Sequence, residues 1–502
     1  MNVSLSASSS QWVCFGNRRP HLRSAQRSVD RLCHVVPPAK RGLSNTTRLG
    51  GACTVARPEQ LVVAAGRYMT IVGLAGRVLD ASNQSTRGVL RRFLGIPYAV
   101  APSGHLRFGR PNRLTDYLPN GSWYAYAHGP PCPQNGPLFE SSDEDCLRVS
   151  IWAPYVCNAS EPPKPVVVAL AGEWLQSGDA SRHEALWQEL VLQGDLIVAA
   201  PNHRLGVLGF FAGDVPDAKG NDAIYDVLLA LTWIKDNAAA FHGDANLMVA
   251  LGHGSGGFML ATDLLQGSGG HFKRYILHGL SLRSNFPENN DVTGVSLLKA
   301  PLNCSGSSTE PVTKCLRGKK YKDIVASTAA LEPLRFVPSR YQQPIDRVFN
   351  ATDLRSVFRN LSGVEIICGY SAVEGSALFD EYVFPSLKAD AAGGFDPPKV
   401  FSQIVHFFGY NFKTHFDLLP GSVKENLKKP ELRGFREILT DVSTNCPMLK
   451  QAKEAGIRGA TVYHYASLGP QDLFEPALTL EDIIQFAKTG SVHCFHPFPA
   501  VF

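Results

Sequence analysis

The sequence lacks the features that would place the chain in a membrane or on a nucleic acid. Its 502 residues contain no apolar run of about 18, so we expect no transmembrane anchor. Acidic residues are scarce only near the amino terminus: residues 1–67 hold ten Lys or Arg and two Asp or Glu, whereas the remainder holds 39 basic and 42 acidic residues. The net charge of +5 therefore belongs to this segment, and we expect no nucleic-acid partner. We also expect no cofactor and no metal.

The amino-terminal segment also lacks the apolar core of about 7 to 15 residues that a secretory signal peptide needs. Residues 1–60 are rich in Ser and Arg, a composition shared by mitochondrial transit peptides. We interpret residues 1–67 as a basic segment that is either disordered or the product of a wrongly assigned start. Residues 68–502, where regular patterns begin, are expected to form one domain.

Cysteines and glycosylation sequons nonetheless favour an oxidising compartment. The chain has eleven cysteines, some closely spaced, and eight Asn-x-Ser/Thr sequons. We therefore expect the protein in the secretory pathway or outside the cell; the alternative is a cytosolic protein with reduced, buried cysteines. The candidate glycosylation sites are Asn83, Asn120, Asn158, Asn303, Asn350 and Asn360.

Short apolar runs that alternate with helical stretches predict an α/β fold. Residues 165–171, 195–200 and 247–251 are typical of buried strands. Residues 221–240 have the apolar spacing of an amphipathic helix. Glycine and proline separate these elements, and no internal repeat is present, so the pattern indicates a single α/β architecture.

The tetrapeptide Gly252-His253-Gly254-Ser255 is the most informative part of the sequence. It follows the strand-like run 247–251 and precedes two further glycines and an apolar helical run. A strand, a sharp glycine-flanked turn and a helix form the nucleophile elbow of α/β-hydrolases, whose central residue is a serine. Here the frame is present and Gly254 occupies the place of the nucleophile.

Further motifs show that the chain, from about residue 69 to its end, resembles type-B carboxylesterases and cholinesterases. The resemblance implies an α/β-hydrolase fold, in which helices flank a large and mostly parallel central sheet, with a shortened carboxyl-terminal part. The motifs that carry it are residues 92–99, 107–108, 144–147, 204–206, 241–244 and 486–490, with His242 where the family usually has Gly.

The resemblance also implies disulfides, each of which would stabilise the fold by roughly 2–4 kcal/mol in the chain-entropy description. The implied pairs are Cys132–Cys146, Cys304–Cys315 and Cys446–Cys494. No partner is implied for Cys14, Cys33, Cys53, Cys157 and Cys368.

The spacing of the family motif places the missing nucleophile at Gly254. In the family, eleven residues separate the glycine of a Gly-Asp pair from the catalytic serine, and counting from Gly243 reaches Gly254. Ser255 then takes the next position, whose N–H serves the oxyanion hole. An elbow centred on Ser255 would place the bulky His253 two residues before the nucleophile, so Ser255 is the weaker alternative.

The oxyanion hole is also altered. The family has a His-Gly-Gly-Gly-type run after a central strand, and this chain reads Ala171-Gly172-Glu173-Trp174. Glycines there let the backbone direct N–H groups at the developing negative charge. Glu173 and Trp174 replace two of them, so Gly172, Glu173, Trp174 and Ser255 form a degenerate oxyanion hole.

Of the remaining catalytic groups, the resemblance retains the acid and lacks the base. Glu374 matches the triad glutamate of the family. The histidine should follow a Val-Tyr-x-Tyr strand, but residues 469–481 contain none. His464 lies on that strand itself, and His493 and His496 come too late in the sequence. We therefore expect no intact catalytic set.

Three functions are compatible with this pattern. The one we favour is a catalytically inactive member, similar to the neuroligin-like and glutactin-like adhesion proteins of the family, that binds an extracellular protein partner. The second is a residual carboxylic-ester hydrolase that uses Ser255, or whose base was lost from an incomplete gene model. The third is a carrier that holds a small apolar ligand in the former active-site gorge.

Overall fold

The computed structural model describes the chain from Glu59 to Val492, with gaps. Within these ranges, no helix is long and apolar enough to cross a membrane. The described residues are 59–66, 69–79, 86–114, 121–156, 158, 160–284, 286, 291–304, 311–329, 336–338, 358–371, 374–378, 436, 439–467 and 478–492.

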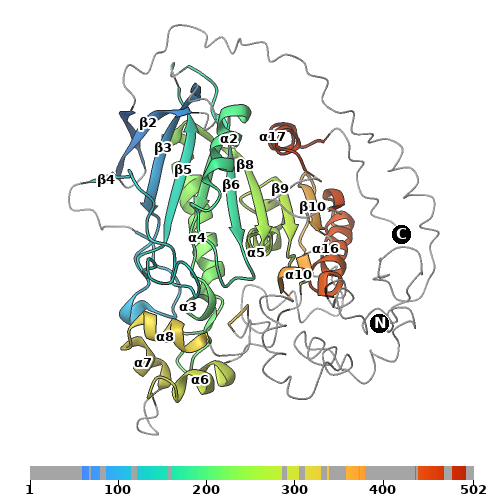
Figure 1. Cartoon of the computed structure of the whole chain (residues 1–502). Coiled ribbons are helices and arrows are strands. Elements are labelled where there is room, and N and C mark those ends of the chain that lie inside the picture. The colour runs from blue at the N-terminus through green and yellow to red at the C-terminus, as the bar shows by residue number, and fades with distance from the viewer. Residues whose placement is uncertain are drawn as a thin grey trace, which may run out of the picture.

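One eleven-stranded sheet organises the molecule (Figure 1). Its strands are β1 (Glu59–Ala65), β2 (Thr70–Leu79), β3 (Thr86–Pro97), β4 (Ser122–Tyr124), β5 (Arg148–Pro154), β6 (Lys164–Gly172), β7 (Ile197–Pro201), β8 (Gly243–Gly254), β9 (Arg274–Gly279), β10 (Glu365–Ser371) and β11 (Thr461–Ser467). They lie in the order β1-β2-β3-β5-β7-β6-β8-β9-β10-β11, with β4 beside β2. The pairings from β1 to β7 in this order are antiparallel, and those from β7 to β11 are parallel.

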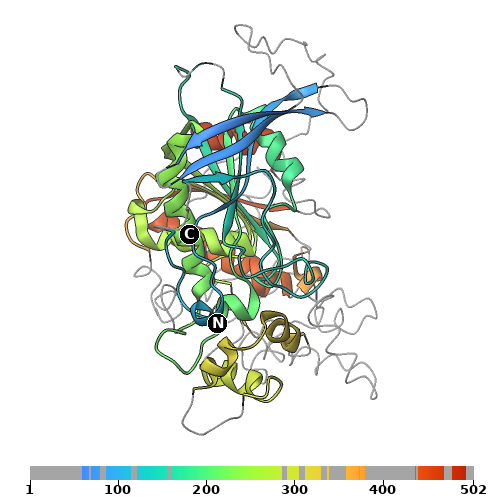
Figure 2. The same ribbon diagram turned by 90° about the vertical axis from the view of Figure 1, so that its left-hand side faces the viewer.

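Helices cover both faces of the sheet (Figures 1 and 2). The helices are α2 (Glu184–Gly194), α3 (Gly206–Phe210), α4 (Asp222–Asn237), α5 (Ser255–Ala261), α6 (Asp291–Lys299), α7 (Val312–Arg317), α8 (Tyr321–Thr328), α10 (Glu374–Leu378), α16 (Cys446–Ile457) and α17 (Leu480–Thr489). Along β6, Val166 and Val168 pack in the core with α4, α5 and α16, whereas Val167 and Ala169 pack in the core with α2 and α17. Successive strand side chains point to opposite faces, so a continuous apolar run gives two cores.

The elements expected from the sequence are present. The strands predicted at 165–171, 195–200 and 247–251 are confirmed as β6, β7 and β8. The helix predicted at 221–240 is confirmed as α4, which continues into a 3₁₀ turn at Ala238–Phe241. His242, where the family usually has Gly, ends that turn with φ 69°, a left-handed conformation that glycine adopts without steric cost.

Regular structure begins earlier than predicted. Glu59–Ala65 form β1, which pairs antiparallel with β2 although it lies inside the segment 1–67 that we expected to precede the domain. The apolar run in this strand is short, and strand propensity alone is a weak signal. Its conformation depends on the free edge that β2 offers, which the local sequence does not show.

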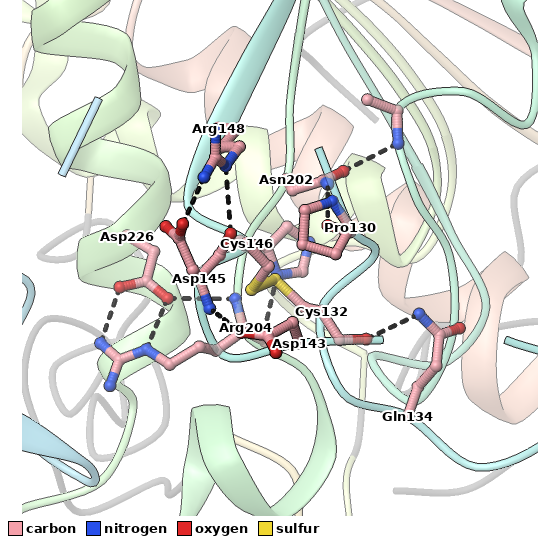
Figure 3. Close-up of a disulfide and its surroundings, with 12 residues drawn as sticks. Pro130, Cys132, Gln134, Asp143, Asp145, Cys146, Arg148, Asn202, Arg204 and Asp226 are labelled. Carbon is pink, nitrogen blue, oxygen red and sulfur yellow. Dashed lines mark hydrogen bonds and ion pairs between the residues drawn. A yellow bond between two sulfur atoms is a disulfide. The ribbon is translucent and has the colours of Figure 1, made fainter. Parts of the chain in front are cut away.

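Two disulfides of the described region join the cysteine pairs that the resemblance implies. Cys132 and Cys146 have Cα atoms 5.0 Å apart, and Cys304 and Cys315 have Cα atoms 5.7 Å apart. Beside the first, the guanidinium of Arg204 forms hydrogen bonds of 2.8 Å and 2.7 Å to the Asp226 carboxylate (Figure 3). Both side chains of this ion pair are buried, so it fixes the loop after β7 against α4.

The other predicted cysteine positions are only partly described. Cys446 is disulfide-bonded, and its implied partner Cys494 lies outside the described residues. Cys368 is a buried free thiol on β10, whose pKa burial raises to about 12. Outside the described residues lie Cys14, Cys33, Cys53 and Cys157.

Three of the candidate glycosylation sites fall on the described surface. Asn158, Asn303 and Asn360 are exposed. In two of them the asparagine Oδ1 accepts a hydrogen bond from the backbone N–H two residues later, 3.0 Å from Ser160 and 3.0 Å from Ser362. These are Asx turns on the surface. The sites outside the described residues are Asn83, Asn120 and Asn350.

Candidate active site

Gly254 forms the turn between β8 and α5. Its backbone has φ 56° and ψ −125°, a conformation that side chains of L-residues rarely adopt. Gly252 and Gly256, two residues to either side, have no room for a Cβ atom: backbone atoms of Gly256 and Gly257 fill that space at Gly252, and the Leu170 backbone fills it at Gly256. The strained residue of the turn is therefore Gly254, and Ser255 is already the first residue of the helix.

The hydroxyl of Ser255 is enclosed in the core. The residue is fully buried, and its Oγ has no hydrogen-bond partner among the described residues. A Cβ atom built at Gly172 would lie 2.7 Å from this Oγ, so the hydroxyl packs against the end of β6. A serine nucleophile needs a base at roughly 2.6–3.2 Å, and the described surroundings of Ser255 supply none.

The segment after β6, where the family builds its oxyanion hole, is a closed turn. The backbone N–H of Glu173 donates a hydrogen bond to the carbonyl of Ser177 at 3.0 Å, and the Glu173 carboxylate forms an ion pair with Arg182. Trp174 and Leu175 have left-handed backbones, with φ 50° and 65°. Each such residue costs roughly 1–2 kcal/mol, which burial of both side chains offsets. The backbone N–H of Glu173 is therefore hydrogen-bonded within the turn itself.

A histidine that the family motifs do not indicate contacts Glu374. Glu374 begins α10, and its Oε1 lies 3.1 Å from Nε2 of His278, a buried residue near the end of β9. The other ring nitrogen, Nδ1, lies 2.6 Å from the hydroxyl of Tyr465. Both nitrogens of His278 are therefore engaged, and neither is directed at a hydroxyl at position 254 or 255.

These residues form one row across four parallel strands. His253 on β8 is the register partner of His278 on β9, which pairs with Gly369 on β10, which pairs with Tyr465 on β11. The two imidazole rings lie parallel, with centroids 5.0 Å apart. A Cβ atom at Gly369 would lie 2.5 Å from the Tyr465 ring, so glycine there lets the tyrosine reach across β10 to His278.

Burial controls the protonation of this row. Burial is the main cause that lowers the pKa of His253 to about 3, and the neighbouring His278 also lowers it. The His253 imidazole is therefore neutral at physiological pH. Burial also raises the pKa of the Tyr465 hydroxyl well above its usual range. His253 and Tyr465 are therefore uncharged beside Glu374 at physiological pH.

Reasoning from the sequence missed His278 and Tyr465. A signal was present: His278 directly follows the apolar residues 275–277, which begin the next strand-like run after the elbow. The carboxyl ends of neighbouring parallel strands meet at one edge of a sheet, so His278 lies beside His253 if the strand that follows the elbow pairs with the elbow strand. The family base instead follows the Val-Tyr-x-Tyr strand, so the family motifs do not indicate His278.

Comparison with known proteins places the chain in a family. A model of the carboxylesterase family matches residues 70–493. The chain belongs to the carboxylesterase family. It is 26% identical to acetylcholinesterase-1 of Trittame loki over 75% of this chain and 72% of that protein. It is also 31% identical to the cholinesterase of Mus musculus over 63% of this chain, and 30% identical to carboxylesterase 3 of Homo sapiens over 49%.

A solved structure shows the same fold. A carboxylesterase of Geobacillus stearothermophilus superposes with a TM-score of 0.64 at 23% identity, covering 84% of this chain and 83% of that one. The fold is therefore the expected α/β-hydrolase fold, a large and mostly parallel sheet flanked by helices. The matched regions span 55% of the mouse cholinesterase and 44% of the human carboxylesterase, about half of those two relatives.

Proposed function

We propose that this member of the carboxylesterase family is catalytically inactive and acts outside the cell by binding a protein partner. The observation that carries the proposal is Gly254. It has the strained backbone of the elbow residue, and it has no side chain that could attack an ester.

Three further features support the loss of hydrolysis. The hydroxyl of Ser255 is buried against Gly172. The N–H of Glu173 is used within its own turn. His278, which contacts Glu374, is held by Tyr465 on its other side. Removing one member of a catalytic triad costs several orders of magnitude in rate, and here the defects extend to nucleophile, oxyanion hole and base.

An exposed aromatic pair supports the protein-binding half of the proposal. Tyr124 on β4 and the nearby Tyr126 are 66% and 39% exposed, and their ring centroids lie 5.7 Å apart. Val63 on β1 is 64% exposed. Val63 and Tyr124 are both register partners of Val72, so they flank the same residue of β2 from its two edges. Exposed tyrosines beside apolar residues are typical of protein interfaces.

The two halves of the proposal have separate tests. For hydrolysis, turnover of short-chain p-nitrophenyl esters by the purified protein should equal the rate without protein. For binding, a screen against cell-surface ectodomains should find a partner whose affinity falls at least tenfold in Tyr124→Ser/Tyr126→Ser. The matched control is Ile457→Ser, which removes a 43% exposed apolar side chain on α16. A blank screen, or equal loss in the control, would contradict the binding function.

The residual-hydrolase alternative rests on two observations. The relatives carry the names of esterases, and Glu374 contacts a histidine. It requires Ser255 to leave its buried position and approach a base, so ester turnover lost on Ser255→Ala would establish it.

The carrier alternative has less support. A cavity beside the carboxyl ends of β6 and β7, lined partly by Asp179, Trp187 and His203, has a volume of about 20 Å³. That volume accommodates about one water molecule, so this cavity does not support a bound apolar ligand. A panel of apolar ligands that raises the thermal unfolding temperature would favour the carrier.

A further inference from the structure

We propose that His253, His278 and Glu374 form a binding site for a divalent transition-metal ion, with zinc the ion that this donor set suits best. The sequence alone predicts no metal, because the three residues are far apart in the chain. The site is independent of the protein-binding function proposed above.

The three side chains converge from three elements. His253 and His278 lie near the carboxyl ends of the adjacent strands β8 and β9, and Glu374 begins α10 after β10. One potential ligand atom from each residue lies within 4.8 Å of the others. Two imidazoles and one carboxylate are a known zinc donor set, which leaves a fourth position open.

His278 and Glu374 already have the spacing of two ligands on one ion. With Zn–N and Zn–O distances of about 2.0–2.1 Å, two tetrahedral ligands lie roughly 3.3 Å apart. His278 Nε2 and Glu374 Oε1 lie 3.1 Å apart. An ion between them would replace the proton that the ion pair now shares, and the carboxylate would contribute the negative charge that a cation in a largely buried site requires.

The Tyr465 hydroxyl can be the hydrogen-bond acceptor that the second ring nitrogen of a metal-binding histidine usually has. Metal-ligating imidazoles almost always donate their other ring N–H to a nearby acceptor, which fixes the tautomer and the ring. The Tyr465 hydroxyl lies 2.6 Å from Nδ1 of His278, where it can accept that proton and leave Nε2 with its lone pair for the ion. Gly369 makes this contact possible because it leaves room for the tyrosine ring.

His253 needs the largest adjustment. Its ring lies parallel to that of His278, and ligand separations of up to 4.8 Å must shorten to roughly 3.3 Å, a movement of about 1.5 Å. Rotation of one side chain supplies such a movement without a change in the strands. His253 and Glu374 are only partly buried, whereas His278 is buried.

The test is a zinc titration of the chelator-treated protein by calorimetry. We expect one ion per chain, with affinity reduced at least tenfold in His253→Gln and in Glu374→Gln. Tyr465→Phe, which keeps the ring and removes only the hydroxyl, should weaken binding roughly 10- to 100-fold. The matched control is His105→Gln, which changes an exposed histidine far from the cluster in sequence and should leave the affinity unchanged. Absence of stoichiometric binding, or binding that survives all three site variants, would overturn the proposal.

A measurement on the unaltered protein covers the case in which a variant does not fold. X-ray absorption of the zinc-loaded chain should show two imidazoles and at least one further oxygen around the ion. A coordination shell with fewer than two imidazoles would assign the bound zinc to a surface site and refute the inference.

Discussion

Replacing Gly254 by alanine should destabilise the protein in two separable ways. A left-handed backbone costs an L-residue roughly 1–2 kcal/mol. In addition, the new Cβ atom would lie within 3.0 Å of the Gly172 carbonyl oxygen, closer than real Cβ atoms approach, and relieving such an overlap in a packed region costs about 1–3 kcal/mol. We therefore expect Gly254→Ala to lose about 2–5 kcal/mol.

Gly104 provides a matched control for the first of these costs. It has the same φ of 56°, and a Cβ atom there would meet nothing within 4 Å. Gly104→Ala should therefore lose only the roughly 1–2 kcal/mol of the backbone conformation. Thermal and urea unfolding of both variants give the comparison. Equal losses, or a smaller loss at Gly254, would show that Gly254 is not pressed against the end of β6.

Other predictions concern the same region and its support. Gly254→Ser should show no ester turnover, because both ring nitrogens of His278 are engaged; measurable turnover would show that His278 can act as the base. Asp226→Asn should lower the free energy of unfolding by about 3–5 kcal/mol in urea, since it leaves the buried Arg204 charge unpaired; a loss below about 1 kcal/mol would contradict this. Burial lowers the pKa of His464 to about 4, so the unfolded chain takes up the proton first as pH falls from about 6.5 towards 4, and up to about 3 kcal/mol of stability is lost in that window. In His464→Phe, the thermal unfolding temperature should fall less steeply between these pH values, and an unchanged slope would assign the loss to other groups.

The sequence was sufficient for the elements and for the position of the elbow. Apolar runs predicted β6, β7 and β8. Residue counting placed the missing nucleophile at Gly254, where the structure has the positive φ. Both follow from local patterns and fixed spacing. β1 was not predicted because its stability depends on pairing with β2.

The row of side chains beside the elbow could not be derived from local patterns. His278 and Tyr465 are 187 residues apart in the sequence and meet only because β9, β10 and β11 are neighbours. Gly369 has no chemistry of its own, and its role is visible only as space for the Tyr465 ring. Parallel strand order, which the sequence leaves open, decides which residues share an edge.

The most direct test of catalytic inactivity is covalent labelling with a fluorophosphonate probe, followed by intact-mass measurement. The probe modifies an activated serine and spares a buried, unactivated one. We predict no mass increase on the native protein, because position 254 has no hydroxyl and the Ser255 hydroxyl is enclosed against Gly172. A single adduct that maps to Ser255 would contradict the inactive elbow and establish a working nucleophile.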